Sequence, residues 1–466
     1  MPENNISLLN NHKPTDLKKV GDFFVLFSKY VSDFCLSPFS YKTPVENHKP
    51  TNFDASTESK MASVALNNNQ KVDVFYYIPF YFSDCKNNGI HQKYLGIWNA
   101  LNKNNISTEF YSLLFGKGPS VIDMNAFKTR NKEIGHFVES RFSALKRVFI
   151  GNYFSLLKKV DFNKFSHLHV RYSFSNYFFI SFLKQIKVKY PNIIISIEIA
   201  TFPYDKEMKD LPKYIILLID KYYRKKLHTY VDKIVCCTDI PTIYGIDVIS
   251  FSNGFEPMAT LPTHNLLKPK SPIVNILAIA SNISDWHGFD RVILGMADYI
   301  KKKDSNICLH IIGDGTEKNN LEKLANTLQI SSLIKFYGYK YETELLEIAQ
   351  TCDFAIGTLG MHRKGVNFDS SLKSRFYASL GLPFILSTKD ICFDNKLPYW
   401  KYVEGNDNAI EIEQIIDYYN NLKVSNPNYK DEMIAYCKQN LAWEHTFKNP
   451  IAFFKTENRA SSLSHL

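Results

Sequence analysis

Short apolar runs alternate along this chain with longer stretches in which hydrophobic residues recur every three or four positions. From residue 71 onward, the apolar runs have the length of β-strands and lack an in–out alternation of hydrophobic and polar residues. Such strands are buried on both faces, as in a parallel sheet covered by helices. The first half predicts strands at Val72–Ile78, Leu168–Tyr172, Ile193–Ile199 and Lys233–Cys237, with helices at Gln92–Asn102, Tyr177–Lys189 and Tyr214–Tyr230.

The second half repeats this alternation. It predicts strands at Val274–Ala280, Ile307–Ile312, Ile334–Tyr337, Phe354–Thr358 and Pro383–Leu386, with helices at Phe289–Lys302, Leu321–Leu328, Glu342–Thr351 and Ser371–Leu380. The predicted fold class is therefore α/β, with two Rossmann-like, doubly wound parallel-sheet domains facing each other across a cleft. Ligands of such sheets bind at the carboxyl ends of the strands, so we expect function in the loops that follow strands.

The predicted domains account for the whole chain of 466 residues. Residues 1–70 are rich in Asn, Ser, Lys and Pro and predict a flexible N-terminal extension, in which the apolar patch Phe23–Cys35 predicts a short docking helix. Residues 71–252 form the first Rossmann-like domain and residues 253–442 the second. Residues 443–466 predict a C-terminal helix returning to the first domain, followed by a tail.

Composition narrows the class of protein. Hydrophobic residues make up 45% and charged residues 22%, as in a globular domain, and the eight Cys show neither metal-ligand spacing nor a disulfide framework. A reducing compartment follows. No window is apolar enough to span a membrane and the N-terminus does not resemble a signal peptide, so we expect a cytoplasmic protein.

The positive charge lies mainly in the first domain. Residues 71–250 hold 26 Lys and Arg against 15 Asp and Glu, while the net charge of the whole chain is +10. This excess favours a polyanion or an anionic membrane surface as partner, with a simply soluble basic surface as the alternative. Nucleic acid is not expected, because no zinc spacing, RNA-binding aromatic signature or DNA-reading helix is present. A peripheral position at the inner face of the cytoplasmic membrane is consistent with this charge.

The most informative segment follows the predicted strand Phe354–Thr358. It carries five basic residues before and within the next helix: His362, Arg363, Lys364, Lys373 and Arg375. That helix is expected to begin at Asp369, Ser370 or Ser371, which places Lys373 in its first turn. A cation is disfavoured there by the helix dipole, unless an anion such as a phosphate lies opposite. A solvated basic loop is the alternative interpretation.

Three other loops after strands have a composition suited to anions. Asn87, Asn88 and Gly89 precede a predicted helix in the first domain, and His287 and Gly288 do so in the second. The Gly313–Gly315 turn follows the strand that ends at Ile312. A lone Gly-x-Gly is weak evidence for phosphate binding, and a structural turn explains it better.

These motifs occur in a familiar order. Trp286-His287-Gly288, IIGDG at 311–315, FYG at 336–338, SLKSRFYASLGLPF at 371–384 and Trp443 make residues 272–443 similar to the donor domain of GT-B glycosyltransferases. The similarity is greatest to family 4 enzymes of bacterial capsule and lipopolysaccharide assembly. FSNGFEP at 251–257 resembles the segment that joins the two domains in these enzymes. In the first half the likeness is looser and is carried by NNGIHQKY at 87–94, VRY at 170–172 and EIATFPYDKE at 198–207.

The resemblance implies a glycosyltransferase that moves a sugar from a nucleotide-sugar donor to a growing surface polysaccharide or a lipid-linked saccharide. Such an enzyme is expected to need no cofactor and no metal. The implied donor-binding residues are His287, Gly288, Gly313, Arg363, Lys364, Asp369, Ser371, Lys373 and Arg375. The predicted acceptor-side residues are Asn88, Gly89 and Arg171. Arg171 ends its predicted strand, where it either holds a phosphate or pairs with Glu198.

Two departures from the family pattern affect the donor site. The Arg and Lys that the family usually places around its first helix glycine correspond here to Ser281 and His287. The acidic pair spaced eight residues apart, which commonly contacts donor sugar and ribose, corresponds to Phe368 and Phe376. Basic residues of the segment 363–375 then supply the missing charge and Asp369 takes the sugar-binding role, or the donor site has decayed.

The chemistry requires stabilisation of negative charge on the departing nucleoside diphosphate, which cations and N–H dipoles provide. An inverting enzyme also needs a base for the acceptor hydroxyl, and the candidates are His91, Glu198 and Asp205. Family 4 enzymes retain the anomeric configuration, and in a retaining reaction the leaving phosphate can accept that proton. The alternatives are a nucleotide-sugar epimerase of the same architecture and a non-catalytic transferase-like partner.

Overall fold

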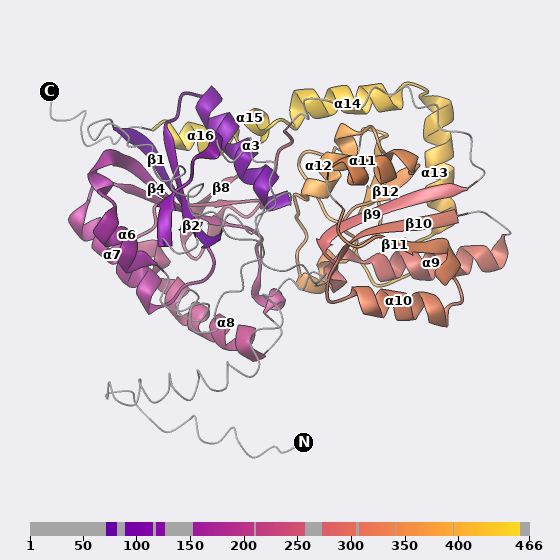
Figure 1. The fold of residues 1–466 in the computed structure, drawn as a ribbon, viewed down its shortest axis with the longest axis horizontal. Coiled ribbons are helices and arrows are strands. Elements are labelled where there is room, and N and C mark those ends of the chain that lie inside the picture. The colour runs from indigo at the N-terminus through magenta and orange to yellow at the C-terminus, as the bar shows by residue number, and fades with distance from the viewer. Residues whose placement is uncertain are drawn as a thin grey trace, which may run out of the picture.

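A computed structural model describes residues 71–81, 89–114, 118–125, 152–208, 211–256, 273–303, 307–340, 342–394 and 396–456. In this part of the chain two α/β domains lie side by side (Figure 1). The expected extension 1–70 with its helix at Phe23–Cys35, and the tail after residue 456, lie outside the described residues.

The first domain contains a sheet of eight strands in the order β3-β2-β1-β4-β5-β6-β8-β7. The pairs from β2 to β8 are parallel, and the edge strands β3 and β7 are antiparallel to their neighbours. The strands are β1 Val72–Tyr81, β2 Thr108–Leu114, β3 Gly118–Val121, β4 Phe165–Arg171, β5 Ile194–Ile199, β6 Lys233–Cys236, β7 Thr242–Ile243 and β8 Ile246–Ser250.

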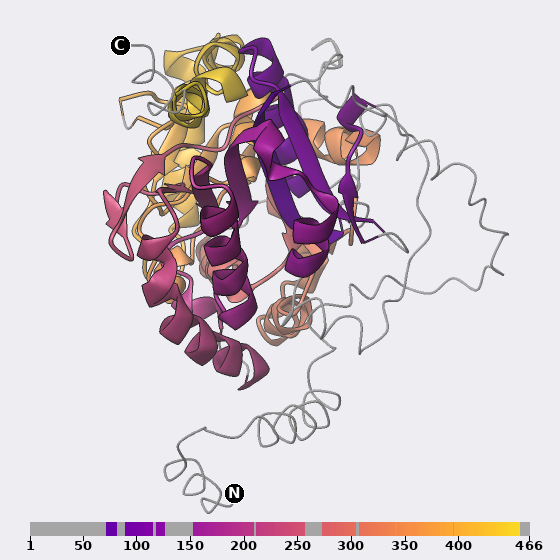
Figure 2. The same cartoon turned by 90° about the vertical axis from the view of Figure 1, so that its left-hand side faces the viewer.

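Helices cover both faces of this sheet, so successive side chains of a central strand enter different cores. Phe75 and Tyr77 of β1 pack with residues of α6 and α7, whereas Val74 and Tyr76 pack with residues of α3 and the C-terminal helices. Figures 1 and 2 show helices on both sides of the sheet. The helices of this domain are α3 Gly89–Lys103, α6 Tyr153–Lys159, α7 Tyr177–Lys189, α8 Leu211–Tyr223, α15 Trp443–Thr446 and α16 Lys448–Phe454.

The second domain contains six parallel strands in the order β11-β10-β9-β12-β13-β14. Its strands are β9 Val274–Asn282, β10 Ile307–Asp314, β11 Ile334–Phe336, β12 Phe354–Ile356, β13 Phe384–Leu386 and β14 Trp400–Tyr402. Its helices are α9 Phe289–Lys302, α10 Lys318–Thr327, α11 Glu342–Thr351, α12 Leu372–Ser379, α13 Ile412–Ser425 and α14 Tyr429–Asn440. Strand order reverses between β9 and β12, which makes the carboxyl ends of these two strands the expected ligand edge.

The chain crosses between the domains at two adjacent segments. The Ser252 N–H donates to the carbonyl of Thr446, and the Phe255 N–H donates to that of Leu441. The indole of Trp443 fills the space beside two glycines, since a Cβ at Gly96 would come within 1.9 Å of its Nε1. These contacts hold α15 and α16 on the first domain.

The predicted fold class is confirmed. Helices Tyr177–Lys189, Phe289–Lys302 and Glu342–Thr351 begin and end at the predicted residues. The helix predicted to run to Tyr230 instead ends at Tyr223 and tightens into the 3₁₀ turn Arg224–Thr229, in which Arg224 bonds to Asp220 and Asp205. The prediction omitted several elements of the described residues: β2, β3, β7, β8, β14, α6, α13 and α14.

Candidate functional site

The N-termini of two helices meet at the boundary between the domains. Gly89 is the first residue of α3 and Leu372 the first residue of α12. A Cβ at Gly89 would lie 3.1 Å from Leu372 Cδ1, so only a residue without a side chain fits this approach comfortably. The side chain of Ser371 does not cap α12. The Ser374 N–H donates to the carbonyl of Ser371 at 3.2 Å, and the N–H groups of Leu372 and Lys373 remain available to an anion.

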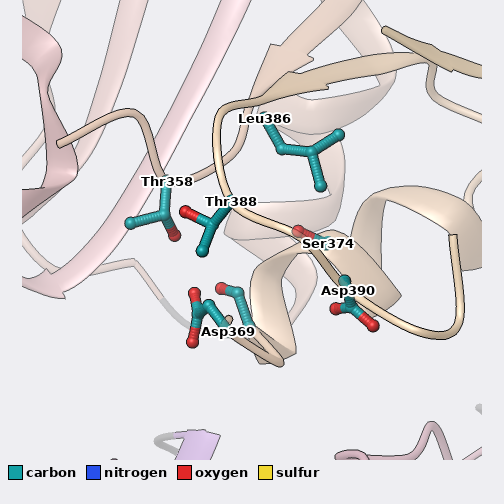
Figure 3. Close-up of a pocket in the computed structure, with 7 residues that line it drawn as sticks. Thr358, Asp369, Ser374, Leu386, Thr388 and Asp390 are labelled. Atoms are coloured by element: carbon teal, nitrogen blue, oxygen red, sulfur yellow. The ribbon is translucent and has the colours of Figure 1, made fainter. Parts of the chain in front are cut away.

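A pocket lies beside this junction, on the second domain. It encloses about 190 Å³, including the part open to solvent, and is lined by Thr358, Asp369, Ser371, Ser374, Leu386, Thr388 and Asp390. Figure 3 shows Thr358, Thr388 and Asp369 gathered on one side of the pocket. Six of the seven lining residues carry a hydroxyl or carboxyl group, although the carboxylate of Asp390 is paired with Arg375, so the others can bond to a ligand with hydroxyls.

Lys373, in the first turn of α12, has a buried ammonium without a compensating partner. Its Nζ makes no hydrogen bond to any described residue and lies 5.5 Å from the ring centre of Phe289. Burial lowers the Lys373 pKa to about 7, and the nearby carboxylate of Asp369 opposes this shift only in part. An unpaired buried cation at a helix N-terminus is costly, and an anion would relieve that cost.

His287 lies in the same neighbourhood and is neutral. Burial holds its pKa well below the usual range, and the charges of Lys373 and Lys364 lower it further. Its Nδ1 lies 3.0 Å from the backbone nitrogen of Ser284 and 3.2 Å from the carbonyl oxygen of the same residue. The family's usual lysine is thus replaced by a neutral imidazole.

Gly288 holds the loop of His287 against the loop after β12. Its φ is +68°, and a Cβ would lie 2.8 Å from Leu359 Cβ. The N–H groups of Leu359 and Gly360 donate to the carbonyls of His287 and Trp286 at 3.1 Å each. Gly288 therefore positions the site through backbone packing.

Lys364 connects the two domains. Its side chain is buried, its Nζ forms an ion pair with Glu207 of the first domain, and it lies 4.3 Å from the ring centre of Trp286. Of the basic residues in the segment 362–375, Lys364 is thus the one that bridges the boundary.

Arg363 and Arg375 were predicted to bind the donor, and the structure gives both a different role. Arg363 bonds to both oxygens of Asp290, to Asp407 and to the carbonyl of Asp285, which fastens its turn to the start of α9. Its guanidinium is already neutralised by two carboxylates, so it has no free charge for a phosphate.

Arg375 points into the protein interior. Its side chain is 1% exposed and forms a two-point ion pair with Asp390, which is 3% exposed. Its Nε donates to the carbonyl of Asn253 in the interdomain segment at 2.8 Å. Arg375 thus anchors α12 to the domain crossing and does not face a ligand.

Asp369 and Ser371 line the pocket, as a role in donor binding requires. Burial, together with the neighbouring charge of Asp390, raises the pKa of Asp369 above its usual range, while Lys373 and Arg375 oppose the shift. A carboxyl group between two cations and another carboxylate can accept hydrogen bonds from sugar hydroxyls.

Gly313 was also predicted to bind the donor, but its backbone is fully engaged. Its N–H donates to the carbonyl of Gly338 at 2.7 Å, and a Cβ would lie 1.7 Å from the carbonyl oxygen of Ala280. The glycine is needed for close packing of the β10 turn against β9, and its N–H is not available to a phosphate.

Phe368 and Phe376, which the resemblance aligned with an acidic pair, pack against protein. Phe368 is 5% exposed and its backbone bridges to Lys389, while Phe376 packs on the core of the second domain. The two substitutions are therefore accommodated as hydrophobic packing.

Glu198 was proposed as a base, yet it is fully buried in the first domain. It bonds to Lys93 Nζ at 2.6 Å, to Tyr76 Oη at 2.5 Å and to Arg171 Nη1. Although burial acts in the opposite direction, Arg171 and Lys93 hold the pKa of Glu198 below its usual range. A carboxylate surrounded by three donors is a counter-ion, and Arg171 pairs with it, which is the second of the two roles predicted for this arginine.

Asp205 is likewise held in ion pairs. Hydrogen bonds from Arg224, at 2.8 and 3.2 Å, lower its pKa, and Lys221 lies 3.2 Å away. His91 is the third residue of α3, but its side chain lies outside the described residues, as does the whole of Asn88. The roles proposed for these two residues stay predictions.

Sequence reasoning missed three hydroxyl residues of the pocket, Thr358, Ser374 and Thr388. The Oγ1 of Thr388 is buried and without a partner among the described residues. Their position after the β12 and β13 strands was the available signal. Across the described ranges, no group of three or more His, Cys, Asp or Glu is arranged to hold a metal ion, and no helix is long and apolar enough to cross a membrane.

Comparison with known proteins supports this picture of the second domain. Residues 267–360 match the family model of glycosyl transferases group 1. No curated protein sequence is significantly similar to the chain.

Solved structures resemble both domains together. A glycosyltransferase from Rickettsia africae is 14% identical, with a TM-score of 0.54 over 83% of this chain and 98% of that one. The trehalose-6-phosphate synthase OtsA is 12% identical, with a TM-score of 0.52 over 82% and 99%. Sucrose-phosphate synthase from Thermosynechococcus elongatus is 11% identical, with a TM-score of 0.50 over 84% and 98%.

The family match and the fold together indicate a glycosyltransferase. At these identities the structural likeness establishes the two-domain GT-B fold, while donor and acceptor depend on the pocket.

Proposed function

We propose that the protein transfers a sugar from a nucleotide-sugar donor to a saccharide acceptor, either a growing surface polysaccharide or a lipid-linked saccharide. The observation that carries the proposal is the unpaired ammonium of Lys373, at the first turn of α12 and beside a pocket of hydroxyl and carboxyl groups. A diphosphate would supply the missing counter-charge, and the attached sugar would meet Asp369, Thr358 and Thr388.

Lys373 would act on the leaving group. Cleavage of the sugar–phosphate bond leaves an additional negative charge on the nucleoside diphosphate. A buried ammonium and the N–H groups of α12 are already oriented toward that charge, and in a site shielded from water their effect is large. The neutral imidazole of His287 lies in the same neighbourhood and adds no competing charge.

We further infer that the reaction retains the anomeric configuration and needs no metal or cofactor. Two of the three candidate bases, Glu198 and Asp205, are held in ion pairs with arginine and lysine. A retaining reaction in which the leaving phosphate accepts the acceptor proton needs no protein base. The buried cation supplies the positive charge that a metal would otherwise provide.

The experiment is a thermal-shift and calorimetric screen of nucleoside diphosphates and nucleotide sugars, followed by detection of diphosphate release on prolonged incubation with water as acceptor. Lys373→Met should weaken binding of the best ligand by at least about tenfold, the value of one charge-assisted hydrogen bond. The control is Lys323→Met, at an exposed lysine of α10. Equal binding by the Lys373 variant and the parent would remove Lys373 from the site.

A second candidate function is a non-catalytic transferase-like partner, which the two phenylalanines Phe368 and Phe376 favour. In that case no nucleoside diphosphate or nucleotide sugar would raise the melting temperature. Binding without slow donor hydrolysis would favour a ligand-binding but inactive protein.

A further inference from the structure

Helix α8 of the first domain carries a band of exposed hydrophobic side chains. Leu211 is 59% exposed, Tyr214 49%, Leu218 49% and Tyr222 62%. The spacing of three, four and four residues places all four on one face of the helix. Scattered exposed apolar residues need no explanation, but four in line on one helix do.

The opposite face of α8 explains why the helix is nevertheless stable. Leu217 is buried in the core of the first domain, and the carboxylate of Asp220 is fully buried. Asp220 accepts hydrogen bonds from the hydroxyls of Tyr172 and Tyr204 at 2.5 and 2.7 Å. The exposed band is therefore not a by-product of a loosely attached helix.

Basic residues flank the band. The segment 211–229 contains five Lys and Arg and a single acidic residue, the buried Asp220. Lys225 and Lys226 are exposed, and the ammonium of Lys226 lies 5.0 Å from the ring centre of Tyr222. The surface thus combines apolar side chains, tyrosines with a polar tip and cations, with no exposed carboxylate on the segment itself.

The band occupies an outer edge of the first domain. Figures 1 and 2 show α8 along the lower edge, beside α7. Tyr177, the first residue of α7, is 60% exposed and close enough to contribute, after burial and Tyr222, to raising the pKa of Tyr223. The aromatic surface therefore continues from α8 onto α7.

We propose that this band docks the first domain on an anionic lipid bilayer. Charge complementarity selects the occupant. Lysines attract anionic headgroups, tyrosines favour the level of the headgroups, and leucines enter the acyl region at the boundary. A protein partner would have to supply acidic groups and an apolar groove together. An anionic membrane presents negative headgroups above an apolar acyl layer over its whole surface.

The proposal does not depend on the donor chemistry, but it has a consequence for the acceptor. Glu207, which forms the ion pair with Lys364 at the domain boundary, precedes the first residue of α8 by four positions in the sequence. Docking through α8 therefore holds the interdomain site near the lipid surface. A saccharide attached to a lipid would then reach the site without leaving the membrane.

The test is co-sedimentation of the full-length protein with vesicles of phosphatidylcholine alone and with vesicles that also contain phosphatidylglycerol. The parent should bind the anionic vesicles only, and added salt should weaken the binding. Leu218→Asp with Tyr222→Asp should lower the partition coefficient at least about tenfold, because two apolar side chains no longer leave water. Lys225→Glu with Lys226→Glu should remove the preference for anionic vesicles.

Matched controls are Val424→Asp, at a residue of α13 that is 82% exposed, and Lys302→Glu, at an exposed residue of α9. Both should bind as the parent does. All variants should melt as the parent does, since the altered side chains are exposed.

Three results would overturn the proposal: failure of the parent to bind anionic vesicles, equal binding to neutral vesicles, or undiminished binding by the Leu218/Tyr222 variant. A dimer in solution that this variant dissociates would assign the band to a second copy instead.

Discussion

Lys364 of the second domain forms an ion pair with Glu207 of the first, and the ring of Trp286 lies 4.3 Å from the same ammonium. The lysine is 5% exposed, so its charge depends on this partner. A buried charge deprived of its counter-ion is strongly unfavourable, and the pair therefore favours the arrangement in which the domains are in contact. The ring of Trp286 lies beside this ammonium, so loss of the counter-ion changes the environment of the indole.

Replacing Glu207 with Gln should shift the molecule toward separated domains. The population competent to bind a ligand between the domains falls, and apparent affinity falls with it. Loss of one charge-assisted bond predicts a decrease of about tenfold in affinity for the best nucleoside diphosphate, measured by calorimetry. The radius of gyration from small-angle scattering should increase, and Trp286 emission should shift to longer wavelength.

Glu344→Gln, which breaks an exposed pair with Lys340, is the control. No change in scattering or affinity would show that the Glu207–Lys364 pair does not hold the domains.

The sequence predicted the alternation of strands and helices because each parallel strand is a run of apolar residues and each helix has a clear apolar periodicity. The elements that the sequence did not predict were missed for a physical reason. Strand β14 is a Trp-Lys-Tyr segment and β7 has two residues, so neither is a run of apolar residues, and both are stabilised by neighbouring strands. Helix α8 combines a buried Asp220 with an exposed Leu218, so hydrophobicity alone could not predict which face is inside.

The candidate site was predicted in part for a similar reason. Sequence spacing identified the basic segment, but charge on a residue does not reveal its partner. Arg375 forms an ion pair with Asp390, fifteen residues later, and Lys364 forms one with Glu207 in the other domain. Both partnerships depend on tertiary contacts. Of the five basic residues in this segment, all of them described, only Lys373 has no hydrogen bond or ion pair, and its place in the first helical turn was the signal that separated it from the others.

The Arg375–Asp390 pair should contribute to stability rather than to ligand binding. Arg375→Met leaves the Asp390 carboxylate buried without its counter-ion, which should lower the free energy of unfolding by about 3–5 kcal/mol. Chemical denaturation measures this directly. Asp390→Asn combined with Arg375→Met should recover much of the loss, because no buried charge then remains unpaired. If Arg375→Met is as stable as the parent but binds nucleotide more weakly, Arg375 contributes to donor binding instead.

Glu198 should behave as a structural counter-ion with a recognisable pH signature. Its folded-state pKa lies below the usual range, so its stabilising contribution is complete above the pKa of the unfolded chain, about 4.3, and is lost as pH falls through the folded-state value. Glu198→Gln leaves Arg171 and Lys93 buried without a carboxylate and should cost about 3–5 kcal/mol at pH 7. The difference in unfolding free energy between variant and parent should shrink in acid. If Glu198→Gln is as stable as the parent and has lost only catalytic activity, Glu198 acts as a base.

Lys373 should link ligand binding, stability and pH in one residue. In the absence of ligand its pKa is about 7 against a usual value of 10.5, so the unfolded chain binds more protons between these values and stability should rise with pH across that window. Binding of a diphosphate needs the protonated form, so affinity should fall as pH rises above 7, by up to tenfold per unit. The terminal phosphate, with a pKa near 6, is already ionised there and does not obscure the effect.

Lys373→Arg keeps its charge at all these pH values, so affinity for a nucleoside diphosphate should no longer fall between pH 7 and 9. Lys373→Met removes an unpaired buried charge, so at pH 6 it should raise the melting temperature while weakening binding. Calorimetric titrations of the parent and both variants at several pH values decide the matter. A parent affinity that is independent of pH, or an arginine variant with the same pH dependence as the parent, would place the titrating group elsewhere.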